Sequence, residues 1–425
     1  MNIEIDILLP AEVEYIMGEL EKSGYESYVV GGCVRDSIMG SKPKDWDICT
    51  SALPDQVIKC FRKHTVIETG LKHGTVTLIL GHKPFEITTY RVDGDYADNR
   101  RPDTVEFVSD LKKDLSRRDF TVNAMAYNPK VGIVDYFNGI DDINAKIIRC
   151  VGSADKRFRE DALRIMRALR FASVLGFSID KTTAEAIHAN KNLLKNIAVE
   201  RIVIELNKLI VGDGAGSIIF EYTPVMAEII PKIAEVAADG DIWKGTVSNI
   251  DSAPADVVLR LSMLLRDVAA HYDNVKDSSV VASIAKKILK RLKYDNMTIK
   301  NVAQIILYQS EEIQAERIHI KRRLNIMGEA TFRQLIEVKK AEIKYQEISA
   351  LTDEIIEQGQ CYALKDLKVT GTDLIDDAGV GKGALVGKML NRLLDMVIDE
   401  EVENDKEKLV QAAKDLIKNY NQMQK

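Results

Sequence analysis

Strand-forming patterns in this chain are confined to about its first third, and this uneven distribution restricts the fold more than any other feature. Runs of β-branched and aromatic residues bounded by turn residues predict strands at 27–30, 46–49, 76–80 and 85–90. Beyond about residue 146 helical spacing takes over, with predicted helices at 157–175, 182–189 and 200–211 and further helical patterns up to residue 425. The sequence therefore predicts an α+β protein with a small α/β head followed by an all-helical remainder.

Two stretches of the helical part are expected to connect domains. Residues 212–216 contain three glycines and an aspartate, which favours a joint. Residues 240–255 combine glycine, serine, asparagine and aspartate, and we predict a loop-rich connection there. The sequence shows neither a clear internal repeat nor a low-complexity segment.

The composition fits a globular protein of about two to four domains. Of the 425 residues, 46% are hydrophobic and 29% are charged, which is sufficient for a buried core and argues against general disorder. The five cysteines are scattered and lack zinc-site spacing, so we expect reduced thiols in a cytosolic protein. No apolar run approaches the ~18 residues of a membrane span, and no signal peptide is visible, so we expect a cytoplasmic location without membrane attachment.

The charge distribution leaves two interpretations open. A net charge of −6 disfavours nucleic acid as a partner when the whole chain is averaged. Residues 156–170 and residues 286–300 nevertheless contain six basic side chains each, and a third basic group spans 317–323. These clusters are either RNA-binding surfaces or ordinary solvated helix faces.

A pair of aspartates, Asp45 and Asp47, is the sharpest candidate for catalysis. The pair lies at the strand predicted at 46–49, where side chains two residues apart share one face. Two such carboxylates could bind magnesium ions, which activate an attacking hydroxyl and neutralise a leaving pyrophosphate. An ordinary surface strand or turn is the alternative interpretation.

Other residues near this pair also suggest a triphosphate site. Gly32 belongs to a Gly-Gly turn between a predicted strand and a short helix, where N–H groups can face a phosphate. Arg35 lies in the first turn of that helix, where its charge needs a phosphate or a neighbouring acid such as Asp36 to balance it. Glu86, in the strand predicted at 85–90, is either a third acidic group beside the metals or an exposed strand residue.

With these residues in view, the segments GGCVRD at 31–36 and DWDI at 45–48 resemble motif A of the nucleotidyltransferase superfamily. They resemble its class II branch, which contains CCA-adding enzymes and bacterial poly(A) polymerases. The resemblance assigns magnesium binding to Asp45 and Asp47, and nucleotide contacts to Gly32 and Arg35. It also implies a polymerase-β-like head with a small mixed sheet, followed by a helical neck, body and tail.

The segment RRDFTVNA at 117–124 resembles motif B, which holds the nucleotide and helps to separate ribose from deoxyribose. Asp119 and Asn123 are four residues apart, so they are neighbours if the segment is helical, and both could bind sugar hydroxyls. The resemblance also places Arg118 at the triphosphate or the sugar. Without it, Asp119 would be a helix-terminal charge and Asn123 a surface residue.

The segment EDALR at 160–164 resembles motif D, with which proteins of this family select the incoming base. Cytosine and adenine present an amine donor beside an unprotonated ring nitrogen, whereas uracil and guanine present the inverse pattern. A carboxylate only accepts hydrogen bonds and a guanidinium only donates them, so an aspartate–arginine pair matches C and A. Asp161 and Arg164 are three residues apart, and we expect them to be neighbours on one helix.

Two further arginines, Arg167 and Arg170, continue this series in steps of three residues. Each step rotates the position by 60° in net terms, so Arg170 is predicted to lie roughly opposite Asp161 on the helix. In the family, arginines at the matching positions line the nucleotide site. An exposed basic helix face with a salt bridge between successive turns is the alternative.

The remaining motifs concern the loop, the neck, the body and the tail. Residues 95–102 resemble the family's flexible loop, which is associated with addition of the final A, and 200–206 resemble motif E, a helix that braces the neck. Residues 264–269 resemble an HD phosphohydrolase segment in which Arg266 replaces the metal-binding histidine, so we expect a body without hydrolase activity. The glycine-rich turn at 381–387 resembles the family's tail and either contacts an RNA phosphate or joins two helices.

We therefore expect a nucleotidyltransferase head at 1–145, a base-recognising neck at 146–215, a helical body at 216–330 and a tRNA-binding tail at 331–425. The resemblance implies an enzyme that adds C, C and A to the 3′ end of tRNA from CTP and ATP, with Mg²⁺. A poly(A) polymerase and an enzyme that adds only the final A share these motifs, and an RNA-binding protein with an inactive head is a rival of another class. The sequence leaves open whether the protein is a monomer or a homodimer.

Overall fold

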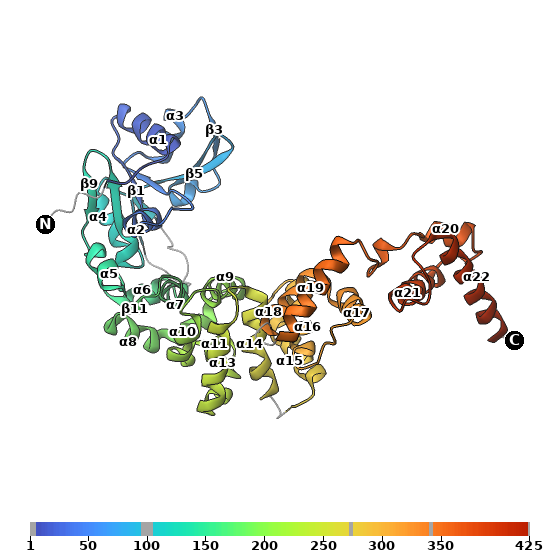
Figure 1. Cartoon of the computed structure of the whole chain (residues 1–425). Coiled ribbons are helices and arrows are strands. Elements are labelled where there is room, and N and C mark those ends of the chain that lie inside the picture. Colours follow the sequence, from blue (N-terminus) through green and yellow to red (C-terminus); the bar gives the residue numbers. More distant parts are fainter. Residues whose placement is uncertain (1–5, 95–104, 272–274, 340–342, 424–425) are drawn as a thin grey trace. The chain divides into compact units, whose positions relative to one another are not determined.

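The computed structural model describes residues 6–94, 105–271, 275–339 and 343–423 (Figure 1). The chain divides into two compact units, Met1–Val257 and Val258–Lys425, which are described separately. The loop predicted at 95–102 to assist the final addition lies outside the described residues. Within the described ranges, no helix combines the length and the apolar character needed to span a membrane.

The first unit is built on a seven-stranded mixed sheet with the strand order β3-β4-β5-β2-β1-β8-β9. Its strands are β1 (Ser27–Val30), β2 (Ile48–Thr50), β3 (Thr65–Ile67), β4 (Thr75–Leu80), β5 (Lys83–Thr89), β8 (Met125–Asn128) and β9 (Gly132–Asp135). All neighbours are antiparallel except β2 and β5, which pair in parallel with Ile48 opposite Ile87. The predicted head with a small mixed sheet is confirmed.

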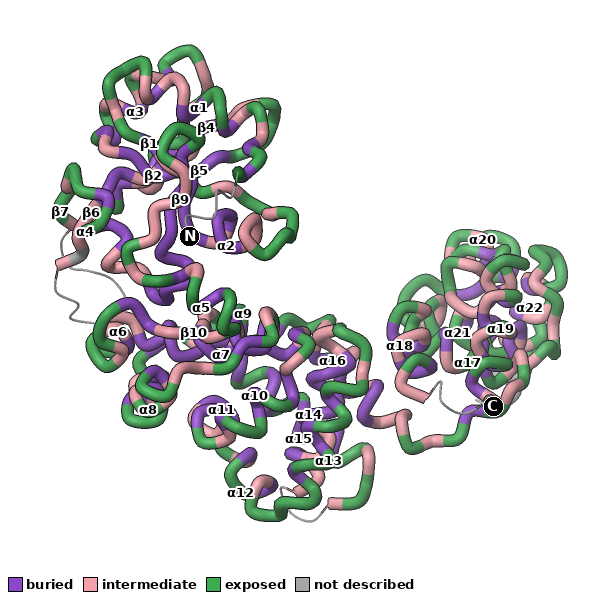
Figure 2. Tube along the Cα trace, turned by 60° about the vertical axis from the view of Figure 1, so that its left-hand side comes forward, coloured by how far each residue is buried: buried purple, intermediate pink, exposed green. Residues whose placement is uncertain are grey.

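The central strands of this sheet are the buried ones. Every residue of β2 is buried (Figure 2), as is every residue of β8, whereas the edge strand β3 is largely exposed. The short helices and hairpin of the head are α1 (Ala11–Lys22), α2 (Gly32–Ile38), α3 (Pro54–Cys60), α4 (Leu111–Ser116), α5 (Gly139–Ala145), and β6 (Arg91–Asp93) paired with β7 (Val105–Phe107). α1 and α2 both contact β1, so the strand-to-helix turn that precedes α2 is held by the sheet core.

The helical part of the first unit begins after β10 (Ile147–Ile148). Its helices are α6 (Ala154–Glu160), α7 (Leu163–Leu175), α8 (Lys181–Asn190), α9 (Val199–Ile210), α10 (Ala215–Glu221), α11 (Thr223–Ile229), α12 (Ile233–Ala237) and α13 (Gly240–Ser252). One parallel strand pair, β10 with β11 (Ser178–Ile179), interrupts the expected all-helical remainder. α9 packs against α7, and the glycine-rich joint predicted at 212–216 coincides with the break between α9 and α10.

Two predictions for this region are wrong. The helix predicted at 157–175 is two helices, because the chain is extended at Asp161 and the Asp161 carboxylate accepts a hydrogen bond from the N–H of Leu163, as an N-cap does. The loop-rich connection predicted at 240–255 is largely the helix α13, which Asp239 caps. Trp243 and Val247, four residues apart, lie on the buried face of α13.

The second unit is helical in its described part. It contains α14 (Val257–Ala270), α15 (Ser278–Arg291), α16 (Asn296–Tyr308), α17 (Arg317–Met327), α18 (Glu329–Lys339), α19 (Ile343–Glu357), α20 (Gly371–Asp376), α21 (Ala384–Ile398) and α22 (Lys406–Met423). Leu259 and a set of buried residues between Ile305 and Ile355 form one hydrophobic cluster, and a set between Cys361 and Ala413 forms another. The domain boundaries expected from the sequence, including the one between 330 and 331, stay predictions.

Candidate active site

The turn between β1 and α2 can be built only with glycine at its first position. Gly31 has φ 84° and ψ −128°, a conformation that side chains other than hydrogen strongly disfavour. A Cβ atom at Gly31 would also stand 3.1 Å from Nη1 of Arg118. This glycine therefore lets the guanidinium of Arg118 approach the backbone beside Gly32, the glycine predicted to contact the nucleotide.

Asp45 and Asp47 lie in a segment without regular secondary structure that leads directly into β2. The strand begins at Ile48 and not at residue 46, although the carbonyl of Asp47 already accepts a hydrogen bond from Val30 of β1 at 3.0 Å. Asp47 is accessible to water, yet protein surrounds it on its other sides. Partial desolvation and the neighbouring charge of Asp45 raise the pKa of the Asp47 carboxyl, Arg118 lowers it, and Glu86 raises it further.

This grouping of carboxylates fits a cation. A raised pKa means that the ionised form of Asp47 is disfavoured in the protein alone, and a bound positive charge would reverse that effect. Across the described ranges, no three carboxylate, histidine or cysteine side chains lie close enough to hold a metal ion by themselves. Two carboxylates completed by water and phosphate oxygens are the arrangement that Mg²⁺ prefers, and a direct role for Glu86 stays a prediction.

Arg118 brings a positive charge next to these acids. Its Nη2 lies 3.4 Å from Oδ2 of Asp114, a fully buried carboxylate that also pairs with Arg117 at 2.7 Å. The Nε atom of Arg118 is buried and has no hydrogen-bond partner among the residues that the structure describes. Arg118 therefore retains a donor, as its predicted contact with the triphosphate or sugar requires.

A chain of polar contacts connects α2 with α7 through the predicted motif B. Arg35 donates to Asp36 at 2.6 Å and to Oδ1 of Asn123, also at 2.6 Å. Asn123 donates to Asp119 at 3.4 Å, so the two residues are neighbours as predicted, although the segment Thr121–Asn123 is a 3₁₀ turn and not an α-helix. Asp119 in turn accepts from Nε of Arg167 at 2.7 Å.

Arg167 and Arg170 meet at one acid and one aromatic ring. Glu205 of α9 lies 3.9 Å from Nη1 of Arg167 and 3.1 Å from Nε of Arg170. The guanidinium of Arg170 lies 3.9 Å from the centre of the Phe171 ring, with those of Arg167 and Arg35 at 5.4 and 5.2 Å. Arg170 therefore belongs to the same cluster as Arg35 and Arg167, where its charge is stabilised by the π face and by Glu205.

Asp161 and Arg164 do not form the helical pair that their spacing predicts. Asp161 precedes α7, and its Oδ2 accepts from Nη2 of Arg201 on α9 at 3.3 Å. Arg164 is buried and donates instead to Glu160 at 2.8 Å and to the carbonyl oxygen of Arg117 at 3.2 Å. Both side chains stay close to the cluster, because Asp161 influences the pKa of Arg167 and Arg164 influences that of Asp119.

The carboxylate of Asp119 supports a prediction about stability. Burial by itself raises its pKa, but the charges of Arg167 and Arg164 outweigh burial and lower the pKa to about 2. Because the pKa lies below that of an unfolded aspartate, Asp119 stabilises the fold above pH ~4, and this stabilisation is lost as the pH falls toward ~2. We expect Asp119→Asn to cost on the order of 3 kcal/mol at neutral pH, as breaking a buried ion pair does.

Melting temperatures of the full chain and of Asp119→Asn between pH 7 and pH 2 measure this effect. The difference in melting temperature between the two proteins should become smaller as the pH falls. Asp155→Asn is the matched control, because Asp155 pairs with Arg159 on the exposed surface and its loss should change little. A gap that stays constant from pH 7 to pH 2 would contradict the assignment.

The basic clusters found in the sequence differ in exposure. Between 156 and 170, Arg164 and Arg170 are largely buried and ion-paired within the first unit, so they do not form an exposed basic face. In the cluster at 317–323, Arg322 pairs with Asp399 at 2.6 Å, and its other members also have acidic partners. The lysines exposed on α15 and α16 are Lys286, Lys287, Lys290 and Lys300.

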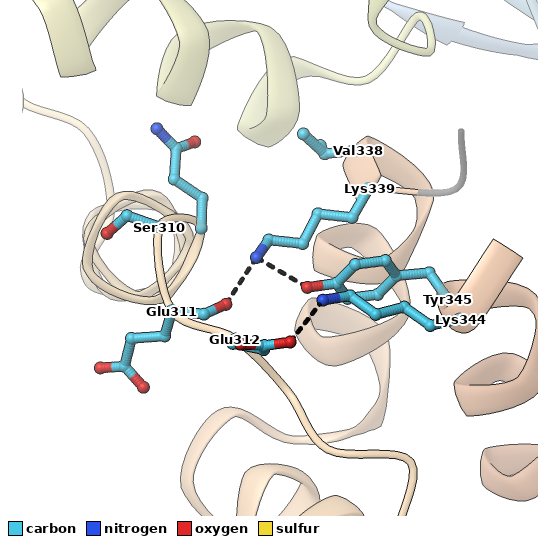
Figure 3. Close-up of a pocket in the computed structure, with 8 residues that line it drawn as sticks. Ser310, Glu311, Glu312, Val338, Lys339, Lys344 and Tyr345 are labelled. Carbon is cyan, nitrogen blue, oxygen red and sulfur yellow. Dashed lines mark hydrogen bonds and ion pairs between the residues drawn. The ribbon is translucent and has the colours of Figure 1, made fainter. Parts of the chain in front are cut away.

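A pocket of about 390 Å³ in the second unit lies outside the predicted site (Figure 3). Lys339 donates to the carbonyl oxygen of Glu311 at 2.6 Å and to the Tyr345 hydroxyl at 3.0 Å, while Lys344 pairs with Glu312 at 2.9 Å. The two lysines and two glutamates that line this pocket balance in charge. In the HD-like segment, Arg266 forms an ion pair with the adjacent Asp267 at 2.6 Å.

Comparison with known proteins agrees with this arrangement. Residues 27–149 match a family described as the poly A polymerase head domain, and residues 278–413 match a tRNA nucleotidyltransferase domain 2. The chain is 37% identical to the CCA-adding enzyme of Geobacillus thermodenitrificans over 93% of its own length and 94% of the relative's. The CCA-adding enzyme of Ligilactobacillus salivarius is 33% identical over 95% of both chains.

The chain belongs to the family of CCA-adding enzymes. Among solved structures, the Bacillus stearothermophilus CCA-adding enzyme in complex with CTP matches with a TM-score of 0.75 and 30% identity, covering 98% of this chain and 100% of that one. The Thermotoga maritima CCA-adding enzyme complexed with tRNA matches with a TM-score of 0.59 at 20% identity over 95% of each chain, which shows the shared fold. The family membership and the nucleotidyltransferase class expected from the sequence are confirmed.

Three residues that contact predicted site residues were not themselves predicted from the sequence. Phe171 follows Arg170 directly, but its spacing is that of an ordinary core residue. Glu205 and Arg201 fall in the segment expected only to brace the neck. A charged residue on the buried side of an amphipathic helix is the signal that identifies Glu205, which is 5% exposed.

Proposed function

We propose that this chain adds C, C and A to the 3′ end of tRNA, using CTP and ATP without a nucleic-acid template and releasing pyrophosphate. Near-full-length identity of 33–37% to CCA-adding enzymes carries the proposal. It is supported by the convergence of the acid pair, the motif B residues and the motif D residues within one compact unit. An enzyme acting on tRNA, with five free cysteines, belongs in the cytoplasm.

In the proposed reaction the 3′ hydroxyl of the tRNA attacks the α-phosphorus of the triphosphate in line, and pyrophosphate leaves. Asp45 and Asp47 would hold Mg²⁺, which supplies activation of the hydroxyl and neutralisation of the leaving group. The chain contributes mainly positioning and fixed charge, as phosphoryl-type transfers require.

Each remaining residue has a proposed task. Arg118, with its unpartnered Nε, binds the triphosphate or the sugar together with Gly32 and Arg35. Asp119 and Asn123 set the orientation of the nucleotide, since they link Arg35 to Arg167. Asp161 and Arg164 select the base, with Arg167 and Arg170 lining the site. Catalysis is assigned to the head at 1–145 and base recognition to the neck at 146–215. The helical body at 216–330 leads to the tail at 331–425, which binds tRNA.

Incubating the purified protein with tRNA transcripts tests the proposal. Transcripts that end before CCA, after the first C and after CC are each supplied with Mg²⁺ and one nucleoside triphosphate at a time. We expect C on the first two transcripts and A on the third, with UTP and GTP rejected. Addition of A alone to the CC transcript would indicate an A-adding enzyme, and long A tracts on unrelated RNA would indicate a poly(A) polymerase. No addition to any transcript would refute the proposal.

A further inference from the structure

The base-selecting carboxylate is held by a residue outside its own motif. One oxygen of Asp161 accepts from the N–H of Leu163 at 3.1 Å, and the other accepts from Nη2 of Arg201 at 3.3 Å. The backbone at Asp161 is extended, between the end of α6 and the start of α7, so Asp161 is not itself part of either helix. Its orientation therefore depends on the start of α7 and on Arg201 from α9.

The α9 helix presents a charge pattern that matches this segment. Arg201 and Glu205 are four residues apart, so they lie one turn apart on the same side of α9. Arg201 faces the acid Asp161, and Glu205 faces Arg167 and Arg170. Successive turns of α9 thus fix opposite charges of the site.

Arg201 also has unused donors. Its Nη1 atom is buried and has no hydrogen-bond partner within the described part of the chain. The Arg201 side chain as a whole is 27% exposed, but a buried donor left without an acceptor costs free energy, and a purely structural helix would be better served by an apolar side chain at this position.

We propose that Arg201 is a positioning residue that determines base specificity, because it holds the Asp161 carboxylate in the orientation that accepts a hydrogen bond from the amine of cytosine or adenine. This inference rests on the proposed function and deepens it. A helix that only braces the neck would affect stability and would change the use of all four triphosphates alike. Loss of a positioning residue changes the ratio of kcat/KM between the triphosphates.

The charge of Arg201 adds a second, pH-dependent signature. Burial raises the pKa of the Asp161 carboxyl, whereas Arg201, the N–H of Leu163 and Arg164 lower it. Arg167, the other charged residue facing Asp161, also favours its ionised form. Once protonated, the carboxyl carries a donor that suits the carbonyl of uracil, so selectivity is lost as the pH falls. Removing Arg201 shifts this loss to higher pH.

The test compares kcat/KM for CTP and UTP on a tRNA lacking CCA in the parent, Arg201→Met and Arg201→Lys. We expect the CTP-to-UTP ratio to fall about tenfold in Arg201→Met, the effect of misplacing one charged hydrogen bond. The CTP-to-UTP ratio of Arg201→Lys should lie between those of the parent and Arg201→Met, since lysine keeps the positive charge and lacks the planar guanidinium group. Combining Arg201→Met with Asp161→Ala should lower the ratio no further than Asp161→Ala alone, because Arg201 acts through Asp161.

Arg149→Met is the matched control. Within the described residues, the Arg149 side chain pairs with Asp142 and Asp180 and not with the acids Asp119, Asp161 or Glu205, so its loss should leave the ratio unchanged. An unchanged ratio and an unshifted pH profile in both Arg201 variants would overturn the inference. If Arg201→Met fails to fold, Arg201→Lys and its pH profile decide. Failure of the proposed function is distinct, because the parent itself would then fail to add C to a tRNA lacking CCA.

Discussion

Replacing Asp45 or Asp47 by asparagine is expected to lower the rate of nucleotide addition about a thousandfold, since loss of a metal ion removes several kcal/mol of charge stabilisation from the transition state. The fold should survive, because both residues are exposed and lie before β2, outside any helix or strand. Single-turnover rates on a tRNA ending in CC, with ATP and Mg²⁺, measure the effect.

The raised pKa of the Asp47 carboxyl makes it possible to distinguish loss of metal binding from loss of the fold. A carboxyl whose pKa is higher in the folded protein than in the unfolded chain destabilises the fold when it ionises. The free energy of unfolding therefore decreases as the pH rises through the pKa of Asp47. Asp47→Asn should therefore melt at or above the parent's temperature at pH 7.5 without metal. Mg²⁺ with ATP should raise the melting temperature of the parent and not that of the variant.

Asp141→Asn is a suitable control, since Asp141 is an exposed aspartate in the first turn of α5. It should retain near-parental activity and the same response to Mg²⁺. Near-normal turnover by purified Asp45→Asn or Asp47→Asn would show that the metals are bound elsewhere.

Local sequence patterns were sufficient to predict elements such as β1, whose conformation is favoured by their own residues. The strand predicted at 27–30 matches β1 at Ser27–Val30, because β-branched residues there alternate between two faces of the sheet. β8 and β9 are not predictable in this way. β8 is buried throughout and is identified only by its pairing with β1, where Val30 lies opposite Ala126. Likewise, α13 is missed when glycine and asparagine content is given more weight than the spacing of its buried residues.

The site shows the same division between local and tertiary information. Short motifs indicate Asp45, Asp119 and Asp161 as functional, since each stands in a recognisable segment. The arginines that pair with the last two come from elsewhere in the chain: Arg167 binds Asp119 from 48 positions away, and Arg201 binds Asp161 from 40 positions away. Spacing within one motif predicted Arg164 as the partner of Asp161, but the capped start of α7 places the two residues differently.

Asp161→Ala is expected to reduce kcat/KM for CTP and ATP by roughly ten- to a hundredfold, the cost of losing one hydrogen bond to a charged group. The substitution removes the acceptor for the amine and adds nothing that repels a carbonyl, so UTP and GTP should be rejected less strongly. Stability should fall little, because the ionised Asp161 is itself disfavoured by burial.

Arg164→Ala is expected to do similar harm to C and A incorporation without restoring a preference for either base. Because Arg164 also anchors to Glu160 and to the carbonyl oxygen of Arg117, a lower melting temperature should accompany its loss, unlike that of Asp161. The double variant should lose less than the product of the single effects, since both side chains serve one base. The measurement is kcat/KM for all four triphosphates on a tRNA lacking CCA. If Asp161→Ala kept full selectivity for C and A, base choice would have to be made by other groups, and the resemblance to motif D would not carry its function.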